Sequence, residues 1–119
     1  IAGLLEEHVV EFATQVESLL RRHGKEIHLR QFAQKRVADI AIDMYAMSCV
    51  LARVSRSIEE KGKEKAELEI AMSEAFFMRA HRRIRCNFKA IERNDDDFMH
   101  YIADKSYELG KYPFDVALE

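Results

Sequence analysis

The segment RAHRRIRCNFKAIER (79–93) carries residue types suited to binding an anion. Five of its cations fall along one broad helical face: Arg79, Arg82, Arg83, Lys89 and Arg93. Such a row binds phosphate, nucleic acid or an acidic protein, or it is a solvated face favoured by the negative end of a helix. The net charge of −2 and the lack of an aromatic residue on that face argue against nucleic acid. An interaction face for an acidic partner and a solvated helix face remain as the two interpretations.

A second candidate, DFMHYIAD (97–104), puts Asp97, His100 and Asp104 on one face of a helix. A carboxylate and a histidine three residues apart form half of a di-metal site in helical bundles. The other half needs a second such pair, and HVVE (8–11) has the reverse order. The incomplete ligand set predicts exposed acids at a helix start, with no bound metal.

Asp39 and Asp43 lie four residues apart and could act as paired acid–base carboxylates. We expect them instead to pair with Lys35, Arg36 or a neighbouring helix, with Asp43 partly buried and hydrogen-bonded. The sequence has no glycine-rich phosphate loop, no Ser/His/Asp set and no zinc-ligand spacing. We therefore predict no catalytic, cofactor-binding or metal-binding residue in this chain, and no enzyme activity of the chain alone.

The elements that would position these side chains are helices. A length of 119 residues suits one domain, and one proline with four glycines favours helical structure. Cys49 and Cys86 lie outside any C-x-x-C pair, so we expect two small buried hydrophobes with free thiols. Because the chain begins at Ile1 and has no signal peptide, we expect it to be a piece of a longer protein.

Apolar residues spaced by three and four predict four helices. The expected segments are 4–23, ending at Gly24; about 33 to Gly62; about 64–93; and a helix that opens at 94–97 and ends at Gly110 and Pro113. The first should bury Leu5, Val9, Phe12, Val16, Leu19 and Leu20. The last should pack through Phe98, Ile102 and Leu109.

The second helix carries the strongest pattern in the chain. Steps of four and three link Ala33, Val37, Ile40, Met44, Met47, Leu51, Val54 and Ile58 without a break. A neighbouring set that includes Tyr45 and Ser48 widens the apolar arc, so we expect a core helix enclosed nearly all round. The charges of Asp39, Asp43 and Arg53 argue against a membrane span. The fold class predicted is all-α, an up-down four-helix bundle with this long second helix at its centre, comprising one domain (1–112) and a short tail (113–119).

The stretches KRVADIAIDMYAM (35–47) and SRS (55–57), preceded by EFATQVESLLRRHGK (11–25), resemble a known family. They are similar to the C-terminal extension of very-long-chain acyl-CoA dehydrogenases and of their mitochondrial sister that assists assembly of respiratory complex I. The similarity covers roughly residues 9–58. Beyond Ser57 it is a similarity of helix layout, and the role of residues 59–119 stays open.

The resemblance implies a parent enzyme that uses FAD, oxidises long-chain acyl-CoA in fatty-acid β-oxidation and works as a homodimer. It implies a mitochondrial location on the matrix side, peripheral to the inner membrane, or a cytoplasmic one in a bacterium. The implied function of this chain is that of a non-catalytic accessory domain. It would pack on the dehydrogenase body, support dimerisation and contact the membrane. The alternative is a module that binds an assembly or scaffold protein. No flavin or catalytic motif of the family maps onto any residue here.

Overall fold

The computed structural model describes residues 2–112 and 114, and within them it contains four α-helices and one 3₁₀ helix. They are α1 (Ala2–His23), η1 (Gly24–Leu29), α2 (Gln31–Lys65), α3 (Glu67–Glu92) and α4 (Asp96–Leu109). The all-α prediction is confirmed, and so is the long second helix, which has 35 residues.

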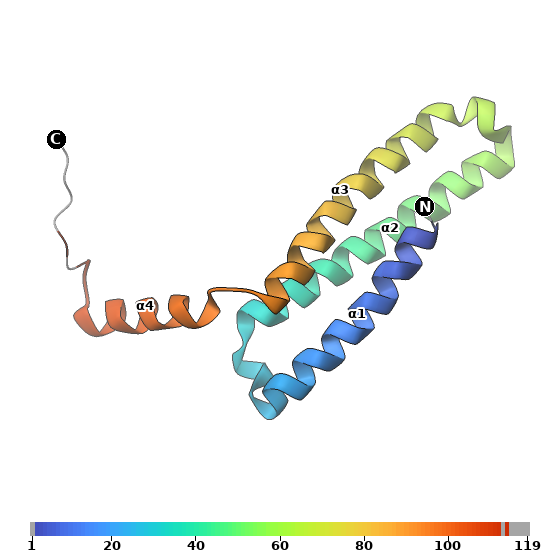
Figure 1. Ribbon diagram of the computed structural model, residues 1–119. Coiled ribbons are helices and arrows are strands. Elements are labelled where there is room, and N and C mark those ends of the chain that lie inside the picture. The colour runs from blue at the N-terminus through green and yellow to red at the C-terminus, as the bar shows by residue number, and fades with distance from the viewer. Residues whose placement is uncertain (1, 113, 115–119) are drawn as a thin grey trace, which may run out of the picture.

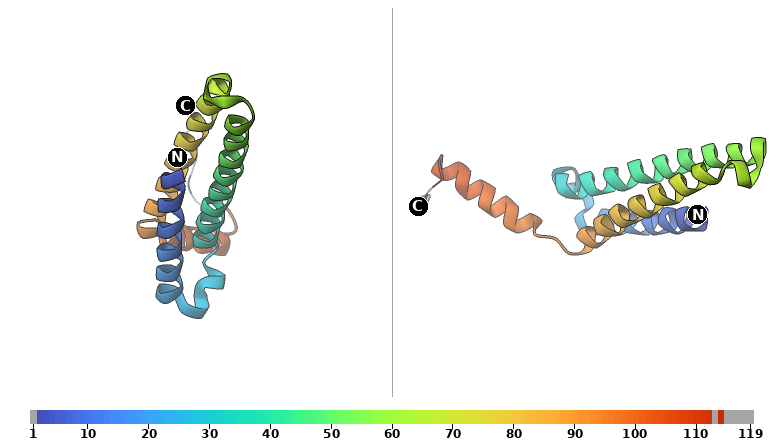
Figure 2. Two further views of the ribbon diagram at one scale, coloured as in Figure 1. Left: turned by 90° about the vertical axis from the view of Figure 1, so that its right-hand side faces the viewer. Right: turned by 90° about the horizontal axis from the view of Figure 1, so that it is seen from above.

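Helices α1, α2 and α3 lie side by side and run alternately up and down, whereas α4 projects from one end of this group (Figure 1). The right-hand view of Figure 2 shows the same separation of α4 from the other helices. The principal dimensions of 64 × 46 × 18 Å describe an elongated, thin molecule. The packed part is therefore a three-helix layer, with α4 as an arm.

The core lies where α2 meets α3, with α1 covering one side. Buried apolar residues from these helices are Leu19, Ala33, Ile40, Met47, Val54, Phe77, Ala80, Ile84, Phe88 and Ile91. The α2 members keep the predicted spacing, which confirms the seam from Ala33 to Val54. Burial of these side chains is the main force that holds the three helices together.

The rest of α2 is more open than predicted. Tyr45 is 74% exposed and Ile42 is 64% exposed, so the expectation of a helix enclosed nearly all round is wrong. Within the described residues α2 is covered mainly by α3 and α1, with η1 against its start, because α4 points away from its length (Figure 1). Cys49 and Cys86 are also exposed, which corrects their assignment to the core.

The first helix differs from the prediction in which residues face inward. Val9 and Leu20 are about half exposed, whereas His8 and Leu19 are buried. The rest of the predicted stripe is confirmed, because Leu19 lies in the core and Leu5 and Phe12 pack against it, whereas His8 was missed since it was counted as polar. The inward face of α1 thus brings an ionisable ring into the core.

Two glycines end helical segments as predicted. Gly110 adopts a left-handed conformation, and its N–H donates to the carbonyls of Ser106 and Tyr107. Gly62, with φ 79° and ψ 164°, breaks the regular part of α2, and a short helical stretch continues to Lys65. Helix α3 consequently begins at Glu67, later than expected.

Helix α4 contributes no buried residue. The expected contacts of Phe98, Ile102 and Leu109 are absent, and all three side chains are exposed. Pro113 and residues 115–119 of the expected tail lie outside the described residues. Among the described helices, none is both long and apolar enough to cross a membrane.

Candidate interaction surface

The five cations predicted as one face divide into two groups. Arg83 donates to both carboxylate oxygens of Asp43, from Nε at 3.1 Å to each and from Nη2 to Oδ1 at 2.7 Å. This hydrogen bonding raises the pKa of Arg83 further above its usual range. The expected structural role of Asp43, bonded to a neighbouring helix, is confirmed, and so is the pairing of Asp39 with Lys35. Arg83 therefore belongs to the joint between α2 and α3.

The other four cations are exposed and form no ion pair among the described residues. Arg79, Arg82 and Lys89 follow one line on the side of α3 opposite the core, with Cys86 between them, and Arg93 is the extended residue that directly follows the helix. Their neighbour Arg85 points to α1 and pairs with Glu11. A continuous row of unpaired positive charge thus occupies the C-terminal half of α3.

The N-terminal half of the same line is apolar. It carries Leu68, Ala71, Met72, Ala75 and Met78, and the three larger side chains are 73%, 63% and 51% exposed. Glu67, Glu74 and Glu92 lie on a flank and leave this line free of acids. We call the ten residues Leu68, Ala71, Met72, Ala75, Met78, Arg79, Arg82, Cys86, Lys89 and Arg93 the outer face of α3.

Two grooves between α2 and α3 border the outer face. One of about 540 Å³ lies beside Met72 and is lined by apolar side chains that include Val50, Val54 and Phe76. The other, of about 500 Å³, lies beside Arg82 and includes Ile42 and the Asp43–Arg83 pair. The three-and-four spacing from Leu68 to Arg93 was visible in the sequence, and only its basic half was predicted.

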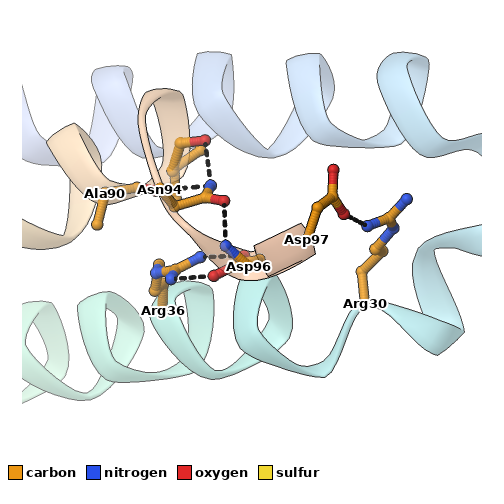
Figure 3. Close-up of polar contacts among 7 residues, drawn as sticks. Arg30, Arg36, Ala90, Asn94, Asp96 and Asp97 are labelled. Carbon is orange, nitrogen blue, oxygen red and sulfur yellow. Dashed lines mark hydrogen bonds and ion pairs between the residues drawn. The ribbon is translucent and has the colours of Figure 1, made fainter. Parts of the chain in front are cut away.

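The joint between α3 and α4 is polar (Figure 3). Arg36 binds Asp96, and Arg30 Nη1 donates to Asp97 Oδ1 at 2.8 Å. The Asn94 side chain donates to the Ala90 carbonyl and accepts from the Asp96 N–H, so it shapes the turn that starts α4. These contacts hold α4 against the first turns of α2. We had expected Arg36 to pair with Asp39 or Asp43, which are nearer in the sequence.

The residues weighed as metal ligands, Asp97, His100 and Asp104, lie on α4. Asp97 is bound to Arg30, and the His100 ring lies 5.6 Å from the Phe32 ring, centroid to centroid. Within residues 2–112 and 114, no cluster of three His, Cys, Asp or Glu side chains could hold a metal. These side chains belong to the α2–α4 joint.

A buried histidine pair joins α1 to α3. His8 Nε2 lies 3.0 Å from His81 Nδ1, and the His8 ring also lies near Phe88. Burial, followed by the nearby His81, lowers the pKa of His8. The buried Nδ1 of His8 has no hydrogen-bond partner within the described part of the chain. The pair therefore favours a neutral His8 in the folded state.

Comparisons with known proteins identify a family. The sequence model of the family described as "ACAD9/ACADV, C-terminal domain" matches residues 1–112. Very long-chain specific acyl-CoA dehydrogenase, mitochondrial, of Bos taurus is 44% identical over 82 residues, which are 69% of this chain and 12% of that protein. The proteins of the same name from Rattus norvegicus and Homo sapiens are 43% identical over 84 and 82 residues, covering 71% and 69% of this chain and 13% and 12% of theirs.

No solved structure matches the chain. The chain spans about an eighth of the length of the curated relatives that it matches. The helical layout and the extent of the family match, taken together, show that the chain belongs to the ACAD9/ACADV C-terminal domain family.

Proposed function

We propose that this chain is a non-catalytic accessory domain of a mitochondrial, FAD-dependent very-long-chain acyl-CoA dehydrogenase that acts in fatty-acid β-oxidation. The observation that carries the proposal is the 44% identity over 82 residues to a dehydrogenase of that name, confined to 12% of its length. The remaining length of such a protein would supply the chemistry. The domain as proposed comprises residues 1–112, followed by a short tail.

The residues described here do not fit an FAD site. Dinucleotides bind where a glycine-rich turn leads into a helix N-terminus that is open to phosphate. The four glycines of this chain are isolated from one another, and Asp95, Asp96 and Asp97 occupy the start of α4. The cavity of about 550 Å³ at that end has a lining of mixed charge, in which these acids and Glu92 stand beside Arg22, Arg30 and Arg93. FAD in the parent enzyme would therefore bind outside this domain.

The proposed role is to pack on the dehydrogenase body, support the homodimer and contact the inner membrane. Support comes from α4, an arm whose large apolar side chains all face outward: Phe98, Met99, Tyr101, Ile102 and Leu109. A stable protein interface buries about 800 Å² on each partner, and exposed apolar side chains grouped on one element are typical of such a contact. The exposed apolar side chains of α4 would be stabilised by a partner surface that covers them.

Deletion of this domain from the parent dehydrogenase tests the proposal. We expect a lower melting temperature and a weaker dimer, measured by calorimetry and sedimentation, with flavin still bound to the remaining body. A matched pair of variants, Phe98→Ser with Ile102→Ser against the single change Lys111→Ser on the exposed C-terminal side of α4, assigns the effect to the arm. A truncated enzyme that is equally stable, dimeric and active would overturn the proposal.

A second candidate function is that of a protein-interaction module. The four unpaired cations on α3 favour it, because a solvated helix face ordinarily mixes both signs of charge. Weaker binding of a partner at higher salt is the expected signature.

A further inference from the structure

We propose that the outer face of α3 binds one antiparallel helix of another protein, which has an acidic N-terminal half and an apolar C-terminal half. The inference deepens the second candidate function, on which it rests. It starts from the lengthwise division of the outer face: large exposed apolar side chains up to Met78, then unpaired cations from Arg79.

The dimensions of the outer face suit a helix. Successive members are three or four residues apart, which is the spacing along which one helix packs against another. From Leu68 to Arg93 the face extends roughly 37 Å at about 1.5 Å per residue. A straight partner helix of similar length would contact both halves at once.

The charges define the partner. Arg79, Arg82, Lys89 and Arg93 form no ion pair among the described residues, and the outer face itself carries no acid. Asp39 and Asp43 line the groove beside Arg82 but leave that cation unpaired, so it is open to a carboxylate of a partner. Acidic residues are most stable near a helix N-terminus, and antiparallel helices align opposite dipole ends. The acidic half of the partner is therefore its N-terminal half. Its apolar half lies over Leu68, with the groove beside Met72 open to a side chain.

A second copy of this chain does not satisfy these requirements. Two outer faces in an antiparallel arrangement would place the cationic half of each against the apolar half of the other. In a parallel arrangement cations would face cations, which costs free energy. A membrane surface fits less well than a helix, because interfacial helices have cations flanking an apolar face along their whole length. On the outer face of α3 the apolar and the cationic side chains lie at opposite ends of the helix.

The test uses the purified 119-residue chain and a synthetic peptide as the probe. The peptide is a helix of about 25 residues with glutamates in its N-terminal half and leucines in its C-terminal half, on one face. A control peptide of identical composition mixes both types along its length. We expect fluorescence anisotropy to show that the first peptide binds at least about tenfold more tightly.

Two variants of the chain locate the site. Arg82→Glu with Lys89→Glu should weaken binding of the first peptide at least about tenfold, while Arg22→Glu with Lys63→Glu, off the face, should leave it unchanged. Equal binding of both peptides, or no effect of the first pair, would overturn the inference. The inference would also be overturned if the first peptide did not bind at all and the Arg82→Glu, Lys89→Glu protein instead lost binding to phosphatidylserine vesicles or lost self-association.

The same charge reversals in the parent dehydrogenase separate this inference from the accessory role. If the parent dehydrogenase with Arg82→Glu and Lys89→Glu stays dimeric and equally stable, the domain still packs on the dehydrogenase body. Failure of the peptide experiment would therefore overturn only the proposal of a partner helix and would leave the accessory role untouched.

Discussion

Arg36 and Asp96 are 60 residues apart and are joined by two parallel hydrogen bonds, Nη1 to Oδ2 at 2.7 Å and Nη2 to Oδ1 at 2.6 Å. Each side chain is 17% exposed, so this ion pair is better shielded than the others at the surface. The hydrogen bond holds the pKa of Asp96 below its usual range. Since α4 buries nothing, this pair and the Arg30–Asp97 pair fix the direction of the arm.

Removal of this pair should loosen the arm. Arg36→Met leaves the Asp96 carboxylate half-buried without its partner, at a cost of about 1–3 kcal/mol in the free energy of unfolding. Urea denaturation measures the cost, and spin labels on α1 and α4 should give a broader distance distribution. Arg56→Met, which breaks the exposed pair with Glu60, should change stability by less than about 0.5 kcal/mol. Equal effects of the two variants would contradict this account of the arm.

The core prediction concerns α2. Met47 is fully buried between the helices, so Met47→Asp places an unpaired carboxylate there and should unfold the chain, at a cost of several kcal/mol out of a total of about 5–15. Tyr45→Asp, two residues away and 74% exposed, is the matched control and should melt like the unaltered protein. Circular dichroism on heating distinguishes the two. A folded Met47→Asp protein would show that the seam is not the core.

Adjacent arginines on α3 should respond in opposite ways. Arg83→Leu leaves the buried carboxylate of Asp43 without its donor and should destabilise the chain by about 1–3 kcal/mol. Arg82→Leu removes an unpaired, exposed cation and should stay within about 0.5 kcal/mol of the unaltered protein. Chemical denaturation of both proteins at pH 7 provides the comparison. Similar losses would mean that the two arginines share one structural role.

The histidine pair predicts a pH dependence. The pKa of His8 is lower in the folded chain, so the unfolded chain binds more protons once the pH falls below about 6.5. The contribution of His8 to the free energy of unfolding is therefore complete above that pH. It declines as the pH falls toward the pKa that His8 has in the folded chain. The groups around His8 are His81 and Arg85, which oppose its protonation, and Glu7 and Glu11, which favour it.

The variant His8→Phe keeps an aromatic ring in the site and removes the titrating group. Urea denaturation between pH 7 and pH 5 should show a flatter profile for this variant than for the unaltered chain. His100→Gln, which removes an exposed imidazole on α4, should retain the original slope. An unchanged slope in the His8→Phe protein would assign the pH dependence to other groups.

The sequence was sufficient to predict the parts of the fold that depend on local pattern. The seam of α2 and the stop at Gly110 follow from helical periodicity and from glycine conformation, which are properties of neighbouring residues. A partly buried and hydrogen-bonded Asp43 was also expected, and the structure buries it against Arg83. Predicting these features required no knowledge of which helices contact one another.

The position of α4 could not be predicted in this way. Periodicity shows that Phe98, Ile102 and Leu109 share a face, and the pattern is the same whether that face is covered by this chain or by another. The contacts that direct the arm join residues far apart in the chain, and Arg36 had nearer acids as candidate partners. The outer face of α3 was half predicted, since its cations were conspicuous and its exposed methionines resembled core residues.

A side chain at Gly62, at the exposed tip between α2 and α3, would meet no neighbouring atom, yet the φ of 79° and ψ of 164° fall in a region that only glycine occupies readily. A mutational scan would therefore report an intolerant residue at the surface, where a side chain has space. Such positions are often assigned to ligand recognition. Here the intolerance would reflect the backbone conformation of the turn between two helices. Intolerance at this position in the family should therefore not be used to assign a recognition residue.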